Sequence, residues 1–254
     1  MIVTILGSGT SQGIPIITCT CAVCSSSDFR DKRLRTSIHI AVEDKSFVID
    51  TGPDFRQQML RERIRKLDAI IYTHEHKDHI SGLDDVRSFN NSQQRHMDIY
   101  AHKRVLDAIK KDFSYAFEEK KYPGVPLLNL IEITNQPFHI YDIPFQPIEV
   151  LHYKLPIFAY RIYNFAYITD ASYISEQETE KLKNVDVLII NALQKTFHIS
   201  HFTLDQALQK IEIIRPKRAY LTHISHTMGL HRDVEKELPE NVKIAYDGLK
   251  IKID

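Results

Sequence analysis

The segment 73–79 constrains the fold of this chain most, because it places three histidines and an aspartate within six residues, directly after the apolar run 69–72. Imidazole nitrogens and a carboxylate at this density suit zinc or manganese. A solvated loop that merely happens to be rich in histidine would not need such strict spacing, and histidines satisfied within the core would leave the aspartate unexplained. We therefore predict a metal site at the end of a buried strand, with ligands His74, His76, Asp78 and His79.

The spacing of these donors favours two metal ions. Alternate residues that leave a strand point the same way, so His74 and His76 can bind one ion. Asp78 and His79 follow on a turn and can face a second ion. Two ions about 3.5 to 4 Å apart can share a bridging hydroxide, which becomes a nucleophile near neutral pH because the metals lower the pKa of bound water. Further ligands must come from other parts of the chain.

The composition is that of an ordinary globular protein. Of 254 residues, 43% are apolar and 26% are charged, and 33 basic residues balance 33 acidic ones. A net charge of zero gives no overall attraction to nucleic acid or membranes, so an anionic substrate must be attracted locally. The first residues lack a basic segment and are interrupted by glycine and proline, and no apolar run approaches the roughly 20 residues that span a bilayer. We expect one α/β domain over residues 1–254 and a cytoplasmic location.

The hydrophobic pattern predicts two sets of strands and helices. In the first half we expect strands at 1–6 and 66–73, a hairpin of 38–42 and 46–49 with its turn at 43–45, and a helix at 103–117. The stretch 120–147 is rich in proline and aromatic residues and is expected to be irregular. In the second half we expect a helix at 204–214 and strands at 165–169, 185–191 and 218–222.

Two short patterns recur in both halves. One strand in each half ends in an aspartate, Asp50 or Asp170, and a later strand ends in threonine followed by histidine, at 73–74 and 222–223. The repetition suggests two related β/α halves that face one another, with metal ligands on the loops at their shared edge. Chance similarity between short apolar strands is the alternative.

The segment 73–79 resembles the signature of the metallo-β-lactamase superfamily, and three later members of that signature follow in the family's order: His152, Asp170 and His223. The resemblance implies two metals bridged by Asp170, each held by three further residues: His74, His76 and His152 for one, and Asp78, His79 and His223 for the other. It also implies a four-layer αβ/βα sandwich with the site at one edge. Asp50 would then orient a ligand histidine, although an exposed turn explains this residue nearly as well.

Three cysteines stand close together, at positions 19, 21 and 24. An odd number at this spacing is unsuited to bracing a secreted fold by disulfides. Three thiols on a tight loop can bind one zinc ion with one further ligand, whereas free buried thiols and redox cysteines are the alternatives. His226 lies three residues after the implied ligand His223 and can complete the set. We predict a closed structural zinc site that pins the N-terminal loop, formed by Cys19, Cys21, Cys24 and His226.

Further motifs narrow the resemblance to cyclic phosphodiesterases of the PhnP type, relatives of tRNase Z that hydrolyse phosphoribosyl 1,2-cyclic phosphate. These motifs are the cysteine cluster and the segments 6–13, 82–87 and 225–231. The match covers nearly the whole chain, but the interval 90–147 carries no signature, and we expect substrate choice to differ there. The glycines of 6–13 indicate a tight turn with close backbone approach. They do not form a dinucleotide-binding loop, since Gln12 stands where glycine is required and no helix follows.

The resemblance also assigns a role to a histidine outside the ligand set. By its position ahead of Leu204 and Asp205, His201 matches the family's catalytic histidine. Its implied role is to stabilise the phosphorane-like charge and to protonate the departing oxygen, which a group with a pKa near 6.5 can do at cellular pH. His198 is a second candidate, and either residue could instead be a neighbour of the helix N-terminus.

We therefore expect a metal-dependent phosphodiesterase that uses two catalytic zinc or manganese ions and one structural zinc. Its substrate is expected to be a small cyclic phosphodiester of the phosphoribosyl 1,2-cyclic phosphate or 2′,3′-cyclic nucleotide type. A thioester or lactone hydrolase of the glyoxalase II-like kind is an alternative, because the same metal pair can polarise a carbonyl. A nuclease like tRNase Z should need an extended basic arm, which the sequence lacks. A sensor without turnover would not need seven ligands. We expect a small-molecule substrate, no membrane association and, from relatives, a homodimer.

Overall fold

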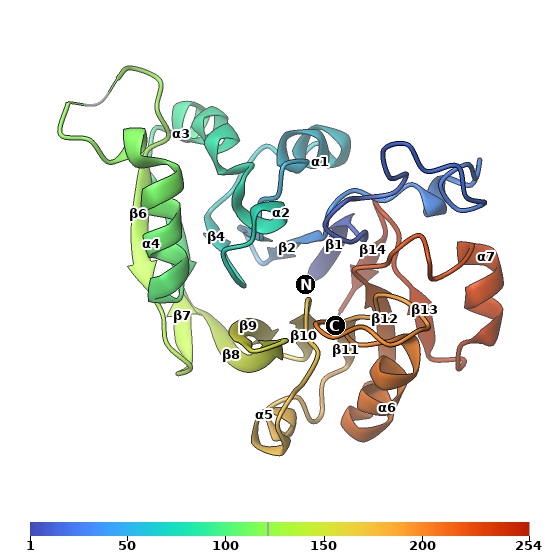
Figure 1. Ribbon diagram of the computed structural model, residues 1–254. Helices are drawn as coiled ribbons and strands as arrows, with labels where there is room; N and C mark the ends of the chain where they lie inside the picture. Colours follow the sequence, from blue (N-terminus) through green and yellow to red (C-terminus); the bar gives the residue numbers. More distant parts are fainter. Residues whose placement is uncertain (121, 254) are drawn as a thin grey trace.

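The described residues, 1–120 and 122–253 of a computed structural model, form two seven-stranded sheets packed face to face, with helices on both outer sides (Figure 1). The strand order is β14-β1-β2-β3-β4-β5-β6 in the first sheet and β13-β12-β11-β10-β9-β8-β7 in the second. The chain thus completes nearly all of one sheet before it begins the other. This arrangement confirms the predicted αβ/βα sandwich and its two facing halves.

The first half supplies strands β1 (Ile2–Gly7), β2 (Ser37–Val42), β3 (Lys45–Ile49), β4 (Ala69–Ile71), β5 (Met97–Ala101) and β6 (Leu128–Glu132), and the last strand, β14 (Lys250–Lys252), joins the same sheet. Its helices are α1 (Phe55–Glu62), α2 (Lys77–Ile80), α3 (Arg87–Gln93) and α4 (Lys103–Asp112). Three short 3-10 helices accompany them: η1 (Phe29–Asp31), η2 (Leu83–Val86) and η3 (Ser114–Ala116).

The second half supplies strands β7 (Phe138–Ile140), β8 (Ile143–His152), β9 (Leu155–Ile162), β10 (Phe165–Ile168), β11 (Val187–Asn191), β12 (Arg218–Thr222) and β13 (Val242–Ile244). Its helices are α5 (Glu176–Glu180), α6 (Leu204–Ile214), α7 (His231–Val234) and the 3-10 helix η4 (Glu235–Glu237).

Each sheet combines a parallel and an antiparallel part. Strands β3 to β6 run parallel in the first sheet, and strands β10 to β13 run parallel in the second. The other neighbouring strands pair antiparallel. Because the carboxyl ends of parallel strands meet at one edge of a sheet, the loops after β3 and β4 lie together, as do those after β10 and β12.

Aromatic and branched side chains fill the space between the two sheets. Phe47 of the first sheet and Phe145 of the second meet edge to face, with ring centroids 5.5 Å apart. Tyr160 and Tyr167 are also completely buried in this layer. Each such side chain contributes about 1.5–3 kcal/mol through burial, so the layer holds the two sheets, and thereby the two sets of loops, in fixed relation.

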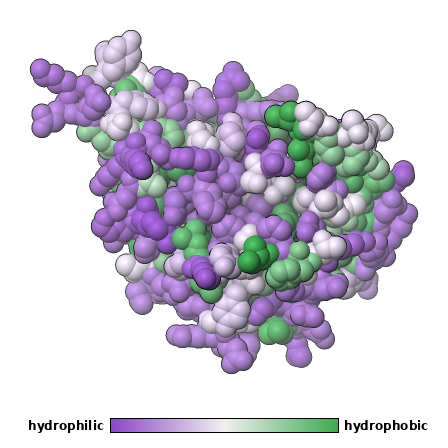
Figure 2. Space-filling view, in the orientation of Figure 1, coloured by the Kyte–Doolittle hydropathy of each residue, from purple (hydrophilic) through white to green (hydrophobic). Residues whose placement is uncertain are grey.

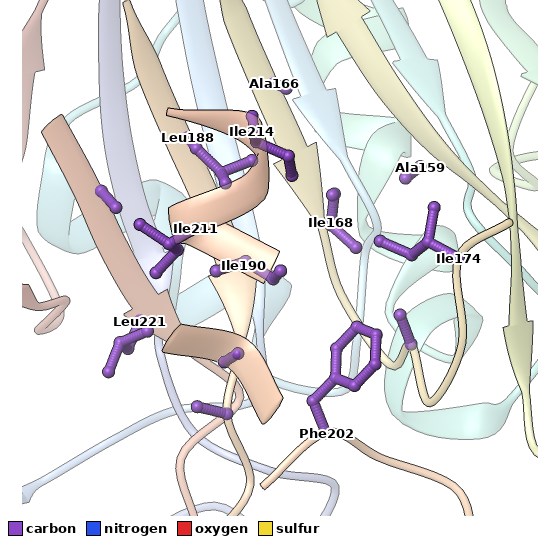
Figure 3. Packing of buried hydrophobic residues seen from close by; sticks show 14 of the residues in the cluster. Ala159, Ala166, Ile168, Ile174, Leu188, Ile190, Phe202, Ile211, Ile214 and Leu221 are labelled. Carbon is purple, nitrogen blue, oxygen red and sulfur yellow. The ribbon is translucent and has the colours of Figure 1, made fainter. Parts of the chain in front are cut away.

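Helix α6 covers the outer face of the second sheet. Figure 3 shows Ile211 and Ile214 of this helix lying against Leu188 and Ile190 of β11, within one buried cluster. The helix begins at a capping box, in which the Thr203 hydroxyl accepts a hydrogen bond from the backbone N–H of Gln206 and the Gln206 side chain accepts one from the backbone N–H of Thr203. This cap fixes the loop that carries His201.

Several predicted elements agree with the structure and others are wrong. The helix 204–214 and the strand 218–222 are confirmed to the residue. The predicted helix 103–117 ends at Asp112, and Lys45 belongs to a strand instead of a turn. The prediction that 120–147 is irregular is wrong, because β6, β7 and the start of β8 lie there.

Proline misled the prediction for β8. Pro144 pairs with His139 and Pro147 pairs with Tyr160, although proline inside a strand normally argues against one. Pairing with strands on both sides overrides that local preference. Helices α1 and α3, which were not predicted, are capped at their C-terminal ends by Arg63 and Gln94 in left-handed conformations, and no glycine marks either end.

Among the described residues, no helix has both the length and the apolar character needed to cross a membrane.

Candidate active site

The first set of predicted ligands lies where β4 passes through a short loop into α2. His74 is completely buried in that loop, and His76 is the N-terminal cap residue of the helix. Asp78 and His79 lie in the single turn of α2. The tight connection therefore brings all four donors of the segment 73–79 to one edge of the first sheet.

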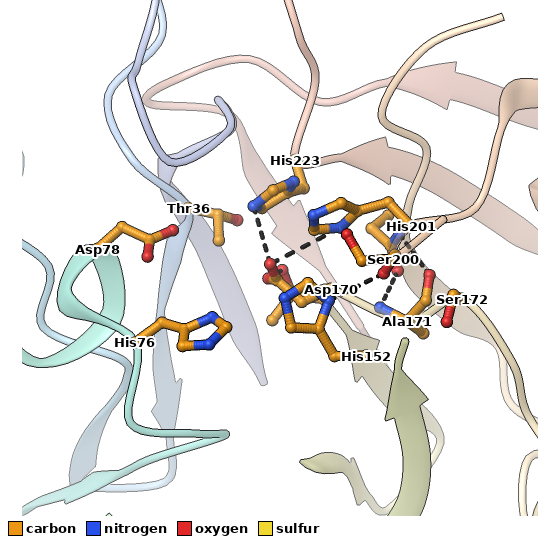
Figure 4. A network of polar contacts seen from close by, with 12 residues as sticks. Thr36, His76, Asp78, His152, Asp170, Ala171, Ser172, Ser200, His201 and His223 are labelled. Atoms are coloured by element: carbon orange, nitrogen blue, oxygen red, sulfur yellow. Dashed lines mark hydrogen bonds and ion pairs between the residues drawn. The ribbon is translucent and has the colours of Figure 1, made fainter. Parts of the chain in front are cut away.

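The second sheet brings its predicted ligands to the opposite side of the same space. His152 is the last residue of β8, Asp170 lies two residues beyond β10, and His223 directly follows β12. Figure 4 shows His76 and Asp78 facing His152, Asp170 and His223. Asp170 and His223 both have a positive φ, 58° and 56°, so the backbone turns sharply at these strand ends.

The donor atoms form two compact groups. Within each group, all ligand atoms lie within 4.8 Å of one another. The groups are the two implied by the sequence resemblance: His74, His76 and His152 in one, and Asp78, His79, Asp170 and His223 in the other. Asp170 Oδ2 lies 3.3 Å from His79 Nε2, and Asp170 Oδ1 lies 3.1 Å from His223 Nε2. The structure thus brings all seven predicted ligands together.

The buried ring nitrogens of this cluster fit a metal site. His79 Nε2 and both ring nitrogens of His223 are buried without a hydrogen-bond partner among the described residues. The nearby carboxylate oxygens are close enough to count as ion pairs, yet they do not form hydrogen bonds with these atoms. Leaving buried polar atoms unsatisfied costs about 1–3 kcal/mol each. Divalent cations at the centre of each group would satisfy these nitrogens and neutralise the carboxylates.

Asp50 contacts one of the predicted ligand histidines, His79. It is completely buried, and its Oδ2 lies 2.7 Å from His79 Nδ1. Asp50 also accepts hydrogen bonds from the backbone N–H and the hydroxyl of Thr73. Asp50 was expected to orient a ligand histidine that the sequence did not specify; the structure shows that this histidine is His79, and the contact leaves its Nε2 directed at the donor group. The alternative of an exposed turn residue is wrong.

Burial and neighbouring charges determine which groups of the cluster are ionised. Burial lowers the pKa of His74 well below 6.5, which keeps its imidazole neutral. Burial by itself would raise the pKa of Asp170, but the neighbouring imidazoles of His223 and His79 outweigh burial and hold that pKa well below its ordinary value. Burial alone would lower the pKa of His79, but the carboxylates of Asp78, Asp170 and Asp50 outweigh burial and raise it well above 6.5. A bound cation would take the place of that proton, because metal binds the neutral imidazole and the ionised carboxylate.

His201 lies against the second-sheet side of the cluster. Its Nδ1 is 3.8 Å from Asp170 Oδ1, and its ring centroid is 4.7 Å from those of both His152 and His223. Burial, with a further contribution from His223, lowers the pKa of His201 to about 3. The sequence had suggested a pKa near 6.5, because burial could not be seen there. His198 lies nearby, with its ring centroid 5.2 Å from that of His201.

The three cysteines and His226 also meet. Cys19 Sγ, Cys21 Sγ and Cys24 Sγ lie 3.3, 3.4 and 3.6 Å from His226 Nδ1, and all three cysteines are free. A hydrogen bond from the backbone N–H of Cys24 is the main cause that lowers the pKa of the Cys21 thiol to about 6. Burial raises the pKa of the Cys24 thiol to about 11. The group has the composition and the compactness of a Cys3His zinc site.

Glycines allow the loops around the site to approach closely. A Cβ atom at Gly7 would lie 1.9 Å from the carbonyl oxygen of Arg35, and one at Gly52 would lie 2.1 Å from the carbonyl oxygen of Asp78. Gly7 therefore confirms the close backbone approach predicted for the opening segment. Gly52 lets the loop after β3 pack directly under α2.

A hollow in the surface lies beside the donor cluster, and the sequence did not predict it. Its volume is about 610 Å³, and it is lined by His76, His152, Tyr153, Lys154, Leu155, Ile199 and Ser200. Tyr153 and Lys154 form the two-residue turn between β8 and β9 and belong to no motif. Their position beside the cluster could have been foreseen only if a β8–β9 hairpin had been predicted directly after His152.

Comparison with known proteins identifies related sequences. A family model described as a beta-lactamase superfamily domain matches residues 45–224. An octanoyltransferase from Porphyromonas gingivalis is 42% identical over 253 residues, which are 98% of this chain and 51% of that protein. A ribonuclease Z from Staphylococcus epidermidis is 29% identical over 163 residues, which are 61% of this chain and 47% of that protein. The chain thus spans about half the length of these curated relatives.

Solved structures agree with this grouping. A crystal structure of a diphosphatase from the PhnP family superposes with a TM-score of 0.93 and 39% sequence identity, covering 100% of this chain and 98% of that one. The Zn²⁺-bound PqqB from Methylobacterium extorquens gives a TM-score of 0.82 at 17% identity, with 100% of both chains covered, and so supports the fold alone.

Proposed function

This chain belongs to the beta-lactamase superfamily of metal-dependent hydrolases, and from that premise we propose that it hydrolyses small cyclic phosphodiesters. The observation that carries the proposal is the position of His201, a histidine that is not needed as a ligand, directly beside Asp170, His152 and His223. Hydrolysis of a phosphodiester needs a group at this place to assist the departing oxygen, whereas metal binding alone does not.

We assign the donors in the same way as the resemblance implies. One divalent metal would be held by His74, His76 and His152, and a second by Asp78, His79 and His223, with Asp170 between them. When bound, such a pair activates a water molecule and neutralises negative charge on the phosphoryl oxygens. The unsatisfied ring nitrogens of His79 and His223 support this assignment. Zinc and manganese both suit the mixed nitrogen and oxygen donors.

Other residues fix the orientation of the ligand histidines. Asp50 accepts a hydrogen bond from His79 Nδ1, and the backbone carbonyl of Ser200 accepts one from His152 Nδ1. Each partner selects the tautomer in which Nε2 carries the lone pair toward the site. Ser200 adjoins His201, so the same loop orients a ligand and delivers the proposed catalytic histidine.

His201 would act on the substrate directly. It stands at the edge of the donor cluster and is 8% exposed, so a phosphodiester bound between the two groups of donors would touch its ring. We infer that His201, which burial keeps neutral, donates a hydrogen bond from its ring N–H to the departing oxygen and so stabilises the negative charge that develops there as the P–O bond breaks. The attacking water supplies the oxygen of the new P–O bond, and its released proton ends on the departing oxygen, so the hydrolysis balances.

Hydrolysis of an acyl thioester is the second candidate. It is favoured by the octanoyltransferase name of the Porphyromonas gingivalis relative, since acyl-transfer enzymes handle acyl esters and thioesters. Because this chain matches only 51% of that relative, the named activity can belong to the half that has no counterpart here.

Metal analysis combined with a substrate panel tests the proposal. We expect about three metal ions per chain and hydrolysis of bis-p-nitrophenyl phosphate and 2′,3′-cyclic AMP. His201→Ala should reduce kcat about 10²- to 10⁴-fold without loss of metal, whereas His198→Ala, a neighbouring control, should reduce it far less. Cleavage of an acyl thioester without cleavage of any phosphodiester would overturn the proposal in favour of the second candidate.

A further inference from the structure

The hollow beside the donor cluster opens directly onto two of the proposed ligands, His76 and His152. The remote part of a substrate whose phosphorus lies at the cluster would therefore extend into this space. Its volume of about 610 Å³ lies within the range of roughly 300–1,000 Å³ that is usual for small-molecule sites. The hollow is larger than a small cyclic phosphate alone requires.

The lining of this hollow is mostly apolar. Among the described residues, besides the two histidines, it contains Tyr153, Leu155 and Ile199, with Ser200 and a single cation, Lys154, and no acidic residue. Tyr153 is 47% exposed and Ile199 is 58% exposed, so both side chains keep large apolar surfaces in water next to the site. On the face drawn in Figure 2, small hydrophobic patches interrupt a largely hydrophilic surface near the middle of the view.

Tyr153 is held firmly at this place. It is the first residue of a two-residue turn that pairs His152 with Leu155, and its backbone N–H donates a hydrogen bond to Ser172 Oγ. The Lys154 ammonium lies 5.2 Å from the centroid of the Tyr153 ring and covers one of its faces. Tyr153 nevertheless remains 47% exposed, which leaves ring surface for a flat partner.

A flat aromatic group fits these features better than an alkyl chain does. An alkyl group gains affinity by being enclosed, whereas this hollow is open to solvent and offers one fixed ring and one exposed aliphatic side chain. Stacking of a nucleobase on an aromatic side chain needs one open ring face only. A nucleotide also carries the phosphodiester that the donor cluster would bind.

We propose that this hollow is a nucleobase subsite in which Tyr153 stacks against the base of a cyclic nucleotide whose phosphodiester lies at the donor cluster. The inference rests on the proposed function and makes it more specific, because it selects a base-bearing substrate over a sugar phosphate without a base. Ile199 covers the edge of the base from the opposite loop, and the Lys154 ammonium attracts the anionic ligand.

The turn conformation provides a sharp test. Tyr153 has a φ of 57°, which asparagine adopts readily, so Tyr153→Asn removes the ring without straining the hairpin. Tyr163 is a matched control, since it is the first residue of the two-residue turn between β9 and β10, has a φ of 52° and is 43% exposed. Tyr163→Asn thus makes the same chemical change at a turn that does not line the hollow.

Binding is measured first, by calorimetry on the manganese-loaded protein with adenosine 3′-monophosphate and with ribose 5-phosphate. Tyr153→Asn should weaken binding of the adenosine nucleotide about 5- to 100-fold and leave binding of ribose phosphate unchanged. Tyr163→Asn and Tyr153→Phe should change neither. An equal loss of affinity for both ligands, or no loss of affinity for either, would overturn the proposed subsite. Tighter binding of hexyl phosphate than of the nucleotide would overturn it too, and would make the hollow an alkyl site.

Kinetics then separate this inference from the proposed function. With 2′,3′-cyclic AMP, Tyr153→Asn should raise KM by a similar factor and change kcat by less than about twofold, because stacking is remote from the reacting bond. If no phosphodiester is hydrolysed but binding still depends on the base and on Tyr153, the proposed function fails and the subsite stands. If phosphodiesters are hydrolysed with no dependence on Tyr153, the subsite fails alone.

Discussion

Asp50 shows at the scale of single residues how the site is held. Its carboxylate binds His79 Nδ1 at 2.7 Å and the backbone N–H and hydroxyl of Thr73 at 2.9 and 2.8 Å. These contacts tie one ligand histidine to the loop that carries the others. Burial raises the pKa of Asp50, yet hydrogen bonds from His79 and Thr73 favour its charged form.

Asp50→Asn should weaken metal binding while leaving the fold in place. The amide has nearly the same shape but no longer fixes the tautomer of His79, and loss of such an orienting partner typically costs about 10- to 100-fold in metal affinity. Competition with a fluorescent chelator measures the affinity. Asp68→Asn is the control, because Asp68 is also buried and accepts a backbone hydrogen bond, from Ser46, in a region away from the donors. Equal losses in both variants would assign Asp50 a merely structural role.

Among the residues of the site, the sequence predicted those whose position follows from local spacing. His74, His76, Asp78 and His79 lie within six residues, so their meeting needed only a strand end and a turn. Tyr153 could not be predicted, because its neighbours His76 and Ile199 are distant in the sequence and meet it only in the folded chain. The lowered pKa of His201 was missed for the same reason, since burial is a property of the assembled fold.

At the scale of secondary structure, the β2–β3 hairpin contains a half-buried histidine that should make stability depend on pH. His39 Nε2 lies 2.8 Å from Ser46 Oγ, and burial lowers the pKa of His39 to about 4. The pKa in the unfolded chain is about 6.5, so between these values the unfolded state binds the proton and the native state does not. The contribution of His39 is fully present above about pH 6.5 and is lost as the pH falls toward 4.

His39→Gln should remove this part of the pH dependence. Between pH 7 and pH 5 the free energy of unfolding of the wild type should fall by about 1–2 kcal/mol more than that of the variant. Urea unfolding at the two pH values measures the difference, and protonation of the site histidines affects both proteins alike. His96→Gln, at an exposed position, should behave as the wild type. A fall of the same size in His39→Gln as in the wild type would show that His39 is not the cause.

Elements were predictable where one hydrophobic period dominates. The helix 204–214 has a clear amphipathic pattern and a capping box, and both of its ends were found. The stretch 120–147 contains strands whose prolines and aromatics obscure the alternation, and only pairing with β5 and β9 makes them strands. Tertiary pairing outweighs local propensity there.

At the scale of the whole molecule, the donor cluster and the cysteine cluster are linked through one strand end. His223 of the donor cluster and His226 of the cysteine cluster are three residues apart after β12, so the N-terminal loop is joined to the active site through the second sheet. Arg33 strengthens the same junction, because its buried guanidinium donates hydrogen bonds to Ser8 Oγ and to the carbonyl of Ala245. The repetition of strand ends in the sequence predicted that two halves meet, and the cysteine spacing with His226 predicted that the N-terminal loop is held beside them. The contacts of Arg33 at this junction were not predicted.

Because the cysteine cluster is joined to the donor cluster but contributes no residue to it, its loss should lower the thermal stability of the protein more than its rate of hydrolysis. Serine is nearly the size of cysteine but a poor zinc ligand, so Cys24→Ser should lower the zinc content by about one ion per chain. Because a metal that binds only the native state adds its binding free energy to stability, Tm should fall by roughly 5–10 °C. Removing metals with a chelator should lower the Tm of the wild type further than that of the variant, and zinc should restore it only in the wild type.

The kcat of the variant, after loading with manganese, should stay within about tenfold of the wild-type value. Unchanged zinc content and Tm would mean that the loop holds free thiols, and loss of hydrolysis with the catalytic metals retained would mean that the cluster takes part in the reaction.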